Sequence, residues 1–227
     1  MRALYYPELS ELPAYQISGD AHHHLVNVVR VQIGEEILLL NGKGLSITTR
    51  VESISKKIVL LQFQNQSLFR ERNSYDLALG IPKKDSLELC LKQATELGFR
   101  RIFLIRSEYS QTRLPEPERL LSLLISAMEQ SNSAYLPEII TGEWTDIPWA
   151  DYQSVLLLSS QSKSSENTAH TASRLLIVGP EGGFSEKELT LFSQRPEIEI
   201  MHLPTPILRT STAVATGAGI LLERLMD

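Results

Sequence analysis

The sequence predicts an α/β protein with two parts, a small β-rich unit in residues 1–68 and a larger α/β domain in residues 74–227. Apolar runs joined by a glycine turn come first, a polar segment follows, and from residue 75 short apolar runs alternate with helix-length amphipathic segments. Such alternation is typical of a parallel sheet covered by helices on both faces. The length of 227 residues suits two compact units, and 42% hydrophobic with 22% charged residues exclude a disordered or fibrous chain.

The first part is expected to contain a β-meander and one helix. Apolar runs at 36–41, 45–54 and 58–64 predict three strands, and the turn at 41–44 has two glycines that can adopt the positive φ of a tight hairpin. A helix is predicted at 20–29, with Asp20 as its N-cap and Leu25, Val28 and Val29 on one face. The polar segment 64–74 follows neither a helical nor a strand period, and we predict that it is a linker.

The second part is expected to alternate strands and helices around one parallel sheet. Strands are predicted at 75–81, 102–105, 155–158, 175–178 and 198–203, and helices at 84–97, 116–133, 186–194 and 212–226. Ligands of such sheets bind beyond the carboxyl ends of the strands. The turns that follow strands are therefore the first places to look for chemistry.

The first such turn is glycine-rich. Gly179-Pro180-Glu181-Gly182-Gly183 follows a buried strand, and Ser185 with Glu188 has the spacing of a capping box for the next helix. Glycines allow backbone to take positive φ or to lie against a flat ligand. The turn lacks the Gly-Lys-Ser/Thr of a P-loop and the Gly-x-Gly-x-x-Gly of dinucleotide folds. It is either a binding loop or a very tight turn.

The second such turn spans residues 203–212 and leads into a helix of small residues. Gly217 and Gly219 lie inside that helix, where each glycine costs about 1 kcal/mol relative to alanine. A helix or partner subunit that approaches closely would explain them. The alternative is an ordinary amphipathic helix that tolerates two glycines.

The basic residues are concentrated in the first half of the chain. The net charge is −5, but residues 1–113 carry 15 of the 22 Lys and Arg and 12 of the 27 Asp and Glu. Lys83, Lys84 and Lys92 lie on or next to a predicted helix. They are candidates for nucleic-acid phosphates, and the alternative is an ordinary solvated surface.

The sequence argues against a metal site, a reactive cysteine, a membrane helix and a signal peptide. The adjacent His22, His23 and His24 would point about 100° apart on a helix and cannot converge on one metal ion, so no metal is expected. Cys90, the single cysteine, is expected to pack in an apolar helix face and indicates a reducing cytoplasm. No apolar run reaches the roughly 20 residues of a membrane helix, and the N-terminus lacks the features of a signal peptide.

Together the two turns resemble the signature of a known family. Residues 179–184, followed by Ile207-Leu208-Arg209-Thr210, are similar to motifs of the 16S ribosomal RNA uracil-N3 methyltransferases of the SPOUT superfamily. Further elements resemble that family in the same order along the chain: a His-x5-Arg element at 24–30, a helix element at 92–98, Ser107-Glu108, and Glu129-Gln130.

The resemblance implies a PUA-like β-barrel that contacts RNA, followed by an α/β trefoil-knot methyltransferase domain. It implies S-adenosylmethionine as cofactor, a homodimer, and methylation of uridine 1498 in the small ribosomal subunit. The cofactor-binding residues would be Gly179, Pro180, Glu181, Gly182, Gly183, Leu203, Ile207, Leu208 and Thr212.

Chemistry constrains the remaining roles. Uracil N3 keeps its proton well above neutral pH, so methyl transfer requires the developing anion to be stabilised. Arg209 is the candidate for this task, because a guanidinium stays charged and cannot serve as a base. Arg30, Lys83, Lys84 and Lys92 are the candidates for RNA phosphates.

The chain also departs from the family pattern. Leu-Gly-x-Arg is replaced by Leu203-Pro204-Thr205-Pro206, Thr-Glu-Thr by Thr210-Ser211-Thr212, and Gly-Arg after the Glu-Gln pair by Asn132-Ser133. Proline removes an amide donor and restricts φ. These departures motivate an alternative, a catalytically weakened rRNA-binding factor. A nucleotide-dependent oxidoreductase is disfavoured because Gly-x-Gly-x-x-Gly is absent.

Overall fold

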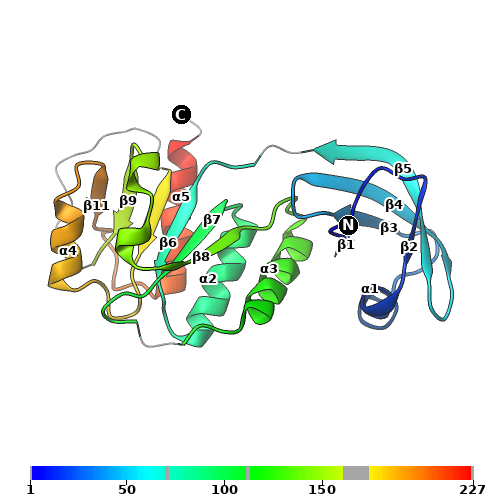
Figure 1. Cartoon of the computed structure of the whole chain (residues 1–227), viewed down its shortest axis with the longest axis horizontal. Coiled ribbons are helices and arrows are strands. Elements are labelled where there is room, and N and C mark those ends of the chain that lie inside the picture. Colours follow the sequence, from blue (N-terminus) through cyan, green and yellow to red (C-terminus); the bar gives the residue numbers. More distant parts are fainter. Residues whose placement is uncertain (1, 70–71, 111–112, 161–173, 226–227) are drawn as a thin grey trace. The chain divides into compact units, whose positions relative to one another are not determined.

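A computed structural model describes residues 2–69, 72–110, 113–160 and 174–225 (Figure 1). The chain forms two compact units, Met1–Arg72 with Ile125–Leu136, and Asn73–Leu124 with Pro137–Asp227. No helix within the described ranges is long and apolar enough to cross a membrane.

The first unit contains a five-stranded mixed sheet in the order β1-β3-β4-β5-β2. Its strands are β1 (Arg2–Tyr5), β2 (Ala14–Ile17), β3 (Glu36–Leu40), β4 (Leu45–Ile54) and β5 (Val59–Phe69). β1 pairs with β3 in parallel, and the other pairs are antiparallel. The predicted meander of β3, β4 and β5 is confirmed. The predicted linker at 64–74 is wrong in its first half, because β5 continues to Phe69 and pairs there with Leu45 of β4.

The predicted helix of the first unit is present but irregular. It consists of α1 (Gly19–His23) and a π-helix, η1 (His24–Val29). The prediction of Asp20 as the N-cap is wrong, because Ser18 occupies that position and Asp20 lies in the first turn. The prediction that Val28 shares the buried face of Leu25 is also wrong, since Val28 is 63% exposed. The wider π turn moves Val28 away from that face.

The segment Ile125–Leu136 packs with the first unit through backbone contacts. The N–H of Tyr5 donates to the carboxylate of Glu129 at 2.8 Å, and the N–H of Gly44 donates to the carbonyl of Ala134 at 2.9 Å. Glu129, from the Glu-Gln element of the sequence, therefore binds the backbone of β1.

The second unit contains a six-stranded sheet in the order β11-β9-β10-β6-β7-β8. All five pairs are parallel. The strands are β6 (Asp76–Gly80), β7 (Arg101–Ile105), β8 (Glu138–Gly142), β9 (Val155–Leu158), β10 (Leu175–Val178) and β11 (Ile198–Met201). Five of these strands were predicted. β8 was not, because it is a partly exposed edge strand without a buried apolar run.

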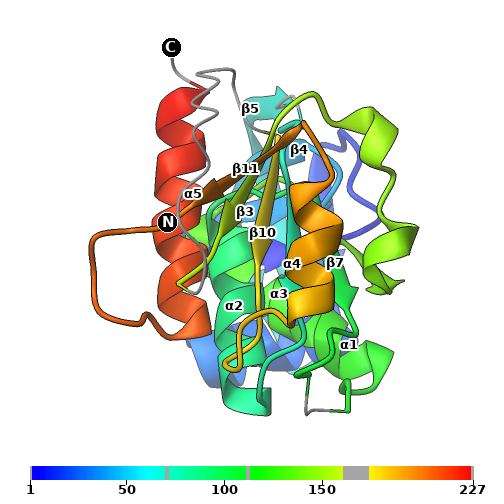
Figure 2. The same cartoon turned by 90° about the vertical axis from the view of Figure 1, so that its left-hand side faces the viewer.

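Helices cover both faces of this sheet, as predicted. They are α2 (Lys84–Glu96), α3 (Pro117–Ser131), α4 (Glu186–Ser193) and α5 (Thr210–Arg224), with short 3-10 turns η2 (Trp144–Asp146) and η3 (Trp149–Asp151). Neighbouring side chains of a strand point to opposite faces. Ile177 of β10 belongs to a core cluster with Phe192 of α4, whereas Leu176 faces Gly217 of α5. Figure 2 shows α4 and α5 on opposite sides of the sheet.

The glycines of α5 have different environments. A Cβ on Gly217 would lie 2.6 Å from Leu176 Cδ1 and 2.9 Å from Leu158 Cδ1. The close approach at Gly217 is therefore to strands β9 and β10, and not to the helix or partner subunit that the sequence suggested. A Cβ on Gly219 would meet nothing within 4 Å. The helix begins at Thr210 and not at 212, and Arg209 is its N-cap.

A buried ionic cluster links the amino-terminal ends of β6 and β7 to the segment before β9. Asp76 is fully buried, and its carboxylate accepts hydrogen bonds from Arg100, Arg101 and Tyr152. The shortest are 2.6 Å, from Arg100 Nη2 and from the Tyr152 hydroxyl. Burial raises the pKa of Asp76, but the hydrogen bonds outweigh burial and hold the pKa below its usual value. The cluster lies at the edge of the sheet opposite to the carboxyl ends of the strands.

Candidate functional site

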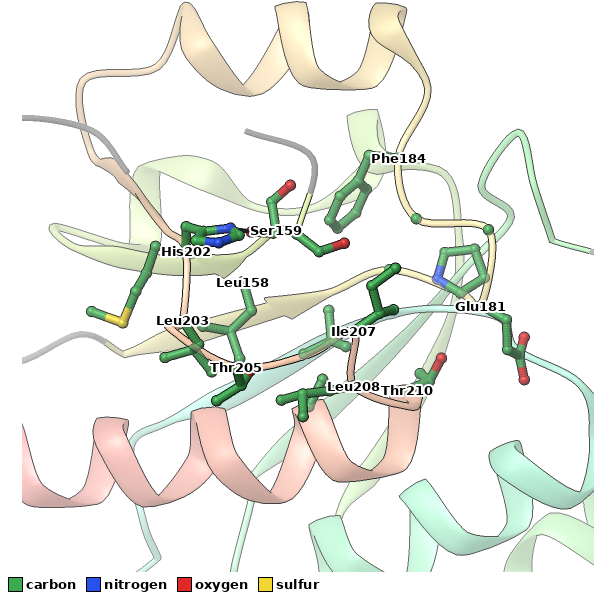
Figure 3. Close-up of a pocket in the computed structure, with 18 of the residues that line it drawn as sticks. Leu158, Ser159, Glu181, Phe184, His202, Leu203, Thr205, Ile207, Leu208 and Thr210 are labelled. Atoms are coloured by element: carbon green, nitrogen blue, oxygen red, sulfur yellow. Dashed lines mark hydrogen bonds between the residues drawn. The ribbon is translucent and has the colours of Figure 1, made fainter. Parts of the chain in front are cut away.

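A cavity of about 310 Å³ lies beyond the carboxyl ends of β9, β10 and β11 (Figure 3). Three loops surround it, one after each strand, together with the start of α5. Its lining residues are Leu158, Ser159, Ser160, Val178, Gly179, Pro180, Glu181, Gly182, Gly183, Phe184, Met201, His202, Leu203, Thr205, Pro206, Ile207, Leu208, Thr210 and Ala213. The two turns that were singled out in the sequence are thus brought to one cavity.

Most of the predicted cofactor-binding residues line this cavity. They are Gly179, Pro180, Glu181, Gly182, Gly183, Leu203, Ile207 and Leu208. Thr212 is not among the lining residues and lies exposed in the first turn of α5. Arg209 is exposed and directly follows the lining residue Leu208. Its side chain forms no hydrogen bond or ion pair with the residues that the structure describes.

Local sequence explains the shape of the glycine loop. The N–H of Gly183 donates to the carbonyl of Pro180 at 2.9 Å, and Gly183 has a φ of +73° that favours glycine. The predicted capping box at the start of α4 is confirmed, since the Ser185 side chain accepts from the Glu188 N–H and the Glu188 carboxylate accepts from the Ser185 N–H. A Cβ on Gly80 of β6 would lie 2.6 Å from Pro180, so the loop packs closely on that strand.

Glu181 contributes backbone to the cavity and its carboxylate to a different contact. Both carboxylate oxygens accept from the N–H of Lys83, at 3.2 and 3.1 Å, where α2 begins. In Figure 3 the carboxylate points away from the other labelled lining residues. A carboxylate at a helix N-terminus stabilises the helix. This contact joins the glycine loop to the start of α2.

The loop after β11 closes the other side of the cavity. The N–H of Thr205 donates to the carbonyl of Leu203 at 2.7 Å, and Ile207 is 84% exposed. Pro204 and Pro206 have no N–H, so this loop offers fewer backbone donors than one without prolines. A ring nitrogen of His202 lies 3.3 Å from the carbonyl oxygen of Ser159, which links this loop to the one after β9.

Glu188 connects three loops at the same edge of the sheet. Its side chain is buried, and it accepts from the N–H of Ser185 at 2.8 Å, the N–H of Glu108 at 3.1 Å and Trp144 Nε1 at 2.7 Å. Burial raises its pKa, but these hydrogen bonds outweigh burial and hold the pKa below its usual value. Sequence reasoning found the contact with Ser185 from its spacing. It missed the other two, because their donors lie 80 and 44 residues away.

The candidate phosphate-binding residues occupy different places. Lys83 and Lys84 are exposed at the start of α2, and Lys92 lies half-buried further along the same helix. Arg30 is exposed in the first unit, at the end of η1, with a φ of +56°.

Two further sequence expectations concern reactive groups. Cys90 is buried in α2, as predicted for a packing residue, and burial raises the pKa of its thiol to about 12. A thiol with such a pKa stays protonated and unreactive at neutral pH. Within the described ranges there is no group of three His, Cys, Asp or Glu side chains that could hold a metal ion.

The chemistry of the cavity suits a flat ligand with polar edges. The lining is mostly apolar side chains and loop backbone, and glycines keep Cβ atoms out of one side. Backbone N–H and C=O groups from three loops can pair with ring nitrogens and amino groups. The carboxylate of Glu181 is engaged elsewhere.

Comparison with known proteins gives matches over nearly the whole chain. The RNA methyltransferase domain family matches residues 70–222, and the RNA methyltransferase PUA domain matches residues 17–64. The ribosomal RNA small subunit methyltransferase E of Rickettsia conorii is 28% identical, with 92% of this chain and 89% of that protein covered. The protein of the same name from Bacillus subtilis is 27% identical, with 91% and 88% covered.

Solved structures agree in fold. A Legionella pneumophila protein in complex with the cofactor SAM is 26% identical, with a TM-score of 0.80 and coverage of 97% of this chain and 96% of that one. A ribosomal RNA small subunit methyltransferase E from Neisseria gonorrhoeae, bound to S-adenosyl methionine, is 24% identical, with a TM-score of 0.83 and coverage of 98% and 97%.

These matches confirm the two-part fold that the resemblance implied, a PUA-like β unit followed by an α/β methyltransferase domain. The match to the methyltransferase domain spans more than half of the chain and includes every residue that lines the cavity. The chain therefore belongs to the RNA methyltransferase family.

Proposed function

We propose that this protein transfers a methyl group from S-adenosylmethionine to N3 of uridine 1498 in 16S rRNA of the small ribosomal subunit. The observation that carries the proposal is the cavity beyond β9, β10 and β11, formed by the two loops whose sequences resemble the uracil-N3 methyltransferases. The names of the relatives support rRNA of the small subunit as substrate. The bound SAM of two structural neighbours supports the cofactor.

The residues of the cavity fit this cofactor. Adenine is a flat ring with donors and acceptors on its edges, and the glycine loop and the loop 203–208 present backbone groups and apolar side chains to such a ring. When bound, the cofactor supplies an electrophilic methyl group on a sulfonium. We assign its binding to Gly179, Pro180, Glu181, Gly182, Gly183, Leu203, Ile207 and Leu208, with Glu181 acting through its backbone. Thr212, which the sequence also suggested, does not line the cavity and is left out of this assignment.

Arg209 is proposed to stabilise the uracil during transfer. It stands at the start of α5, directly after the cavity residues Ile207 and Leu208, and its side chain is exposed. When N3 gives its proton to solvent water, negative charge develops on the uracil oxygens, and a guanidinium beside them would stabilise that charge. A guanidinium has donors and no acceptor, so Arg209 is assigned the role of a cation and not of a base.

The two units are proposed to share RNA binding. We assign residues 1–68 to a PUA-like RNA-binding domain and residues 74–227 to the methyltransferase domain. The side chains assigned to contacts with RNA phosphates are Arg30, Lys83, Lys84 and Lys92. We further propose that the protein is a cytoplasmic homodimer. Light scattering after size exclusion would measure its mass.

Replacing Lys83 and Lys84 together by alanine is expected to weaken RNA binding and flatten its salt dependence. Each contact with a single-stranded phosphate contributes about 0.7 to the slope of log affinity against log salt, so two lost contacts reduce the slope by about 1.4. Fluorescence anisotropy with a labelled rRNA fragment at several salt concentrations measures this slope. Arg119 of α3 and Lys187 of α4, two exposed cations outside the proposed RNA-binding residues, are replaced together by alanine as the control for loss of two charges. An unchanged slope, or an equal fall in both variants, would contradict the assignment.

The proposed activity is tested with the purified protein and small-subunit rRNA. Calorimetry is expected to detect binding of S-adenosylmethionine, and mass spectrometry of the rRNA is expected to find 3-methyluridine at position 1498. The prolines at 204 and 206 favour one other candidate, an rRNA-binding factor without methyl transfer. A folded protein that binds the rRNA but not the cofactor would support that alternative and contradict the enzyme.

A further inference from the structure

An exposed aromatic ring contacts the glycine loop of the cavity, from a loop that the proposed function does not use. Tyr109 belongs to the loop after β7 and is 42% exposed. A Cβ on Gly182, a cavity residue, would lie 2.9 Å from Tyr109 Cβ and 3.2 Å from Tyr109 Cγ. The side chain of Tyr109 therefore contacts the glycine loop where that loop has no side chain. Among the Phe, Trp and Tyr side chains that the structure describes, Tyr109 is the only exposed one.

The loop that carries this ring is held in place by hydrogen bonds. The N–H of Glu108 donates to the buried carboxylate of Glu188 at 3.1 Å. The N–H of Ser107 donates to Ser110 Oγ at 3.1 Å, and the N–H of Ser110 donates back to the carbonyl of Ser107 at 3.0 Å. Residues 107–110 thus form a closed turn that is anchored to the start of α4. The ring is exposed on an ordered element and not on a free loop tip.

A fixed, exposed aromatic ring suits one kind of ligand in an RNA-binding protein. Unpaired bases stack on aromatic side chains, and a ring that is already ordered loses little entropy on binding. Tyr109 touches the loop that lines the proposed methyl-donor cavity, so a base that enters from this side would lie next to the reacting centre. An exposed arginine attracts phosphate and can also stack its guanidinium plane on a base, whereas a tyrosine ring offers an uncharged π-face that suits the base itself.

We propose that Tyr109 is the stacking surface for an unpaired base of the RNA substrate, and that Glu188 is the residue that positions it. The proposal rests on the proposed function, because it takes RNA as the ligand. Glu188 acts by holding Glu108, the neighbour of Tyr109, beside the glycine loop.

The test compares Tyr109→Ala and Tyr109→Phe with the wild type, in methyl transfer to an rRNA fragment and in binding of that fragment. Stacking on a base is worth about 1 to 3 kcal/mol, so Tyr109→Ala is expected to raise the KM and Kd for RNA by about 5-fold to 140-fold. The Kd for S-adenosylmethionine is expected to stay within about twofold, and Tyr109→Phe is expected to resemble the wild type. Leu121→Ala, which removes a 47% exposed apolar side chain from α3, is the matched control.

The outcomes separate the two proposals. If the wild type transfers no methyl group, the proposed function fails, and the RNA Kd still tests Tyr109. If Tyr109→Ala binds RNA like the wild type, or Tyr109→Phe is as weak as Tyr109→Ala, stacking is overturned while the proposed function stands.

A double-mutant cycle tests the role of Glu188. The amide of glutamine has one oxygen that accepts and one NH2 group that only donates. Glu188→Gln therefore loses either the contact with Ser185 or the contacts with Glu108 and Trp144. If Glu188 acts through Tyr109, Glu188→Gln raises the RNA KM, and adding it to Tyr109→Ala raises the KM little further. Fully additive effects would show that Glu188 stabilises the fold without positioning Tyr109.

Discussion

Arg209→Ala is expected to reduce methyl transfer about 100-fold or more, the effect found when one group that stabilises a developing oxyanion is removed. The side chain is exposed and makes no ion pair with the described residues, so its loss leaves the fold intact. The Kd for S-adenosylmethionine is expected to change little, because Arg209 is assigned to the uracil. The loss should therefore fall on the chemical step, which single-turnover methylation measures.

Two variants make the Arg209 result specific. Arg209→Lys keeps the positive charge but loses the planar fork of donors, and partial recovery of the rate is expected. Arg119→Ala removes another surface arginine, whose partner Glu88 also lies in the second unit, and is expected to methylate at the wild-type rate. Wild-type turnover in Arg209→Ala would remove Arg209 from the reaction.

Asp76→Ala is expected to destabilise the protein by about 3 to 5 kcal/mol, because it breaks a buried ionic cluster on one side only. The carboxylate of Asp76 is fully buried, and its removal takes away an acceptor that Arg100, Arg101 and Tyr152 share. Urea unfolding at pH 7 measures the change in the free energy of unfolding. Asp151→Ala is the control, since the Asp151 side chain is 56% exposed and lies 3.6 Å from Arg101. Exposed pairs contribute at most about 1 kcal/mol. Equal losses in both variants would contradict the assigned importance of Asp76.

The same carboxylate predicts how stability depends on acid. The pKa of Asp76 is lower in the folded protein than in the unfolded chain, so the unfolded state takes up its proton first as the pH falls. The stabilisation by Asp76 is complete above the unfolded pKa, near 4, and is lost as the pH falls through the folded pKa. The free energy of unfolding of Asp76→Ala should therefore be well below that of the wild type at pH 7, and the difference between the two proteins should be smaller below pH 3. A difference that is constant from pH 7 to pH 3 would contradict this account.

Elements with strong local signals were predicted closely. β9 and β10 have the predicted bounds, because each is a short run of apolar residues that is buried throughout. β1, β2 and β8 were not predicted, since four or five residues with mixed exposure carry little periodicity. The π-helix that replaces the second half of the predicted helix depends on backbone hydrogen bonds that side-chain periodicity does not reveal.

The candidate site was predicted as two loops but not as a network. The glycine loop and the loop 203–208 stand out because glycine widens and proline narrows the range of backbone conformations at its own position. Nothing near Tyr109 in the sequence indicates that its ring contacts Gly182, 73 positions away. The hydrogen bond between the Lys83 N–H and the Glu181 carboxylate joins residues 98 positions apart, and no local sequence pattern predicts it either.

The sequence by itself determined the α/β class, most helices and strands of the second unit, the capping box of α4 and the two loops that line the cavity. These features depend on residues that are neighbours along the chain. Only the tertiary structure decided that the two loops line one cavity. It also decided that Asp76 accepts hydrogen bonds from two arginines and a tyrosine, and that Glu188 accepts one from the loop of Tyr109. Those contacts follow from the strand order β11-β9-β10-β6-β7-β8, which brings distant segments together at each end of the strands and which no local pattern encodes.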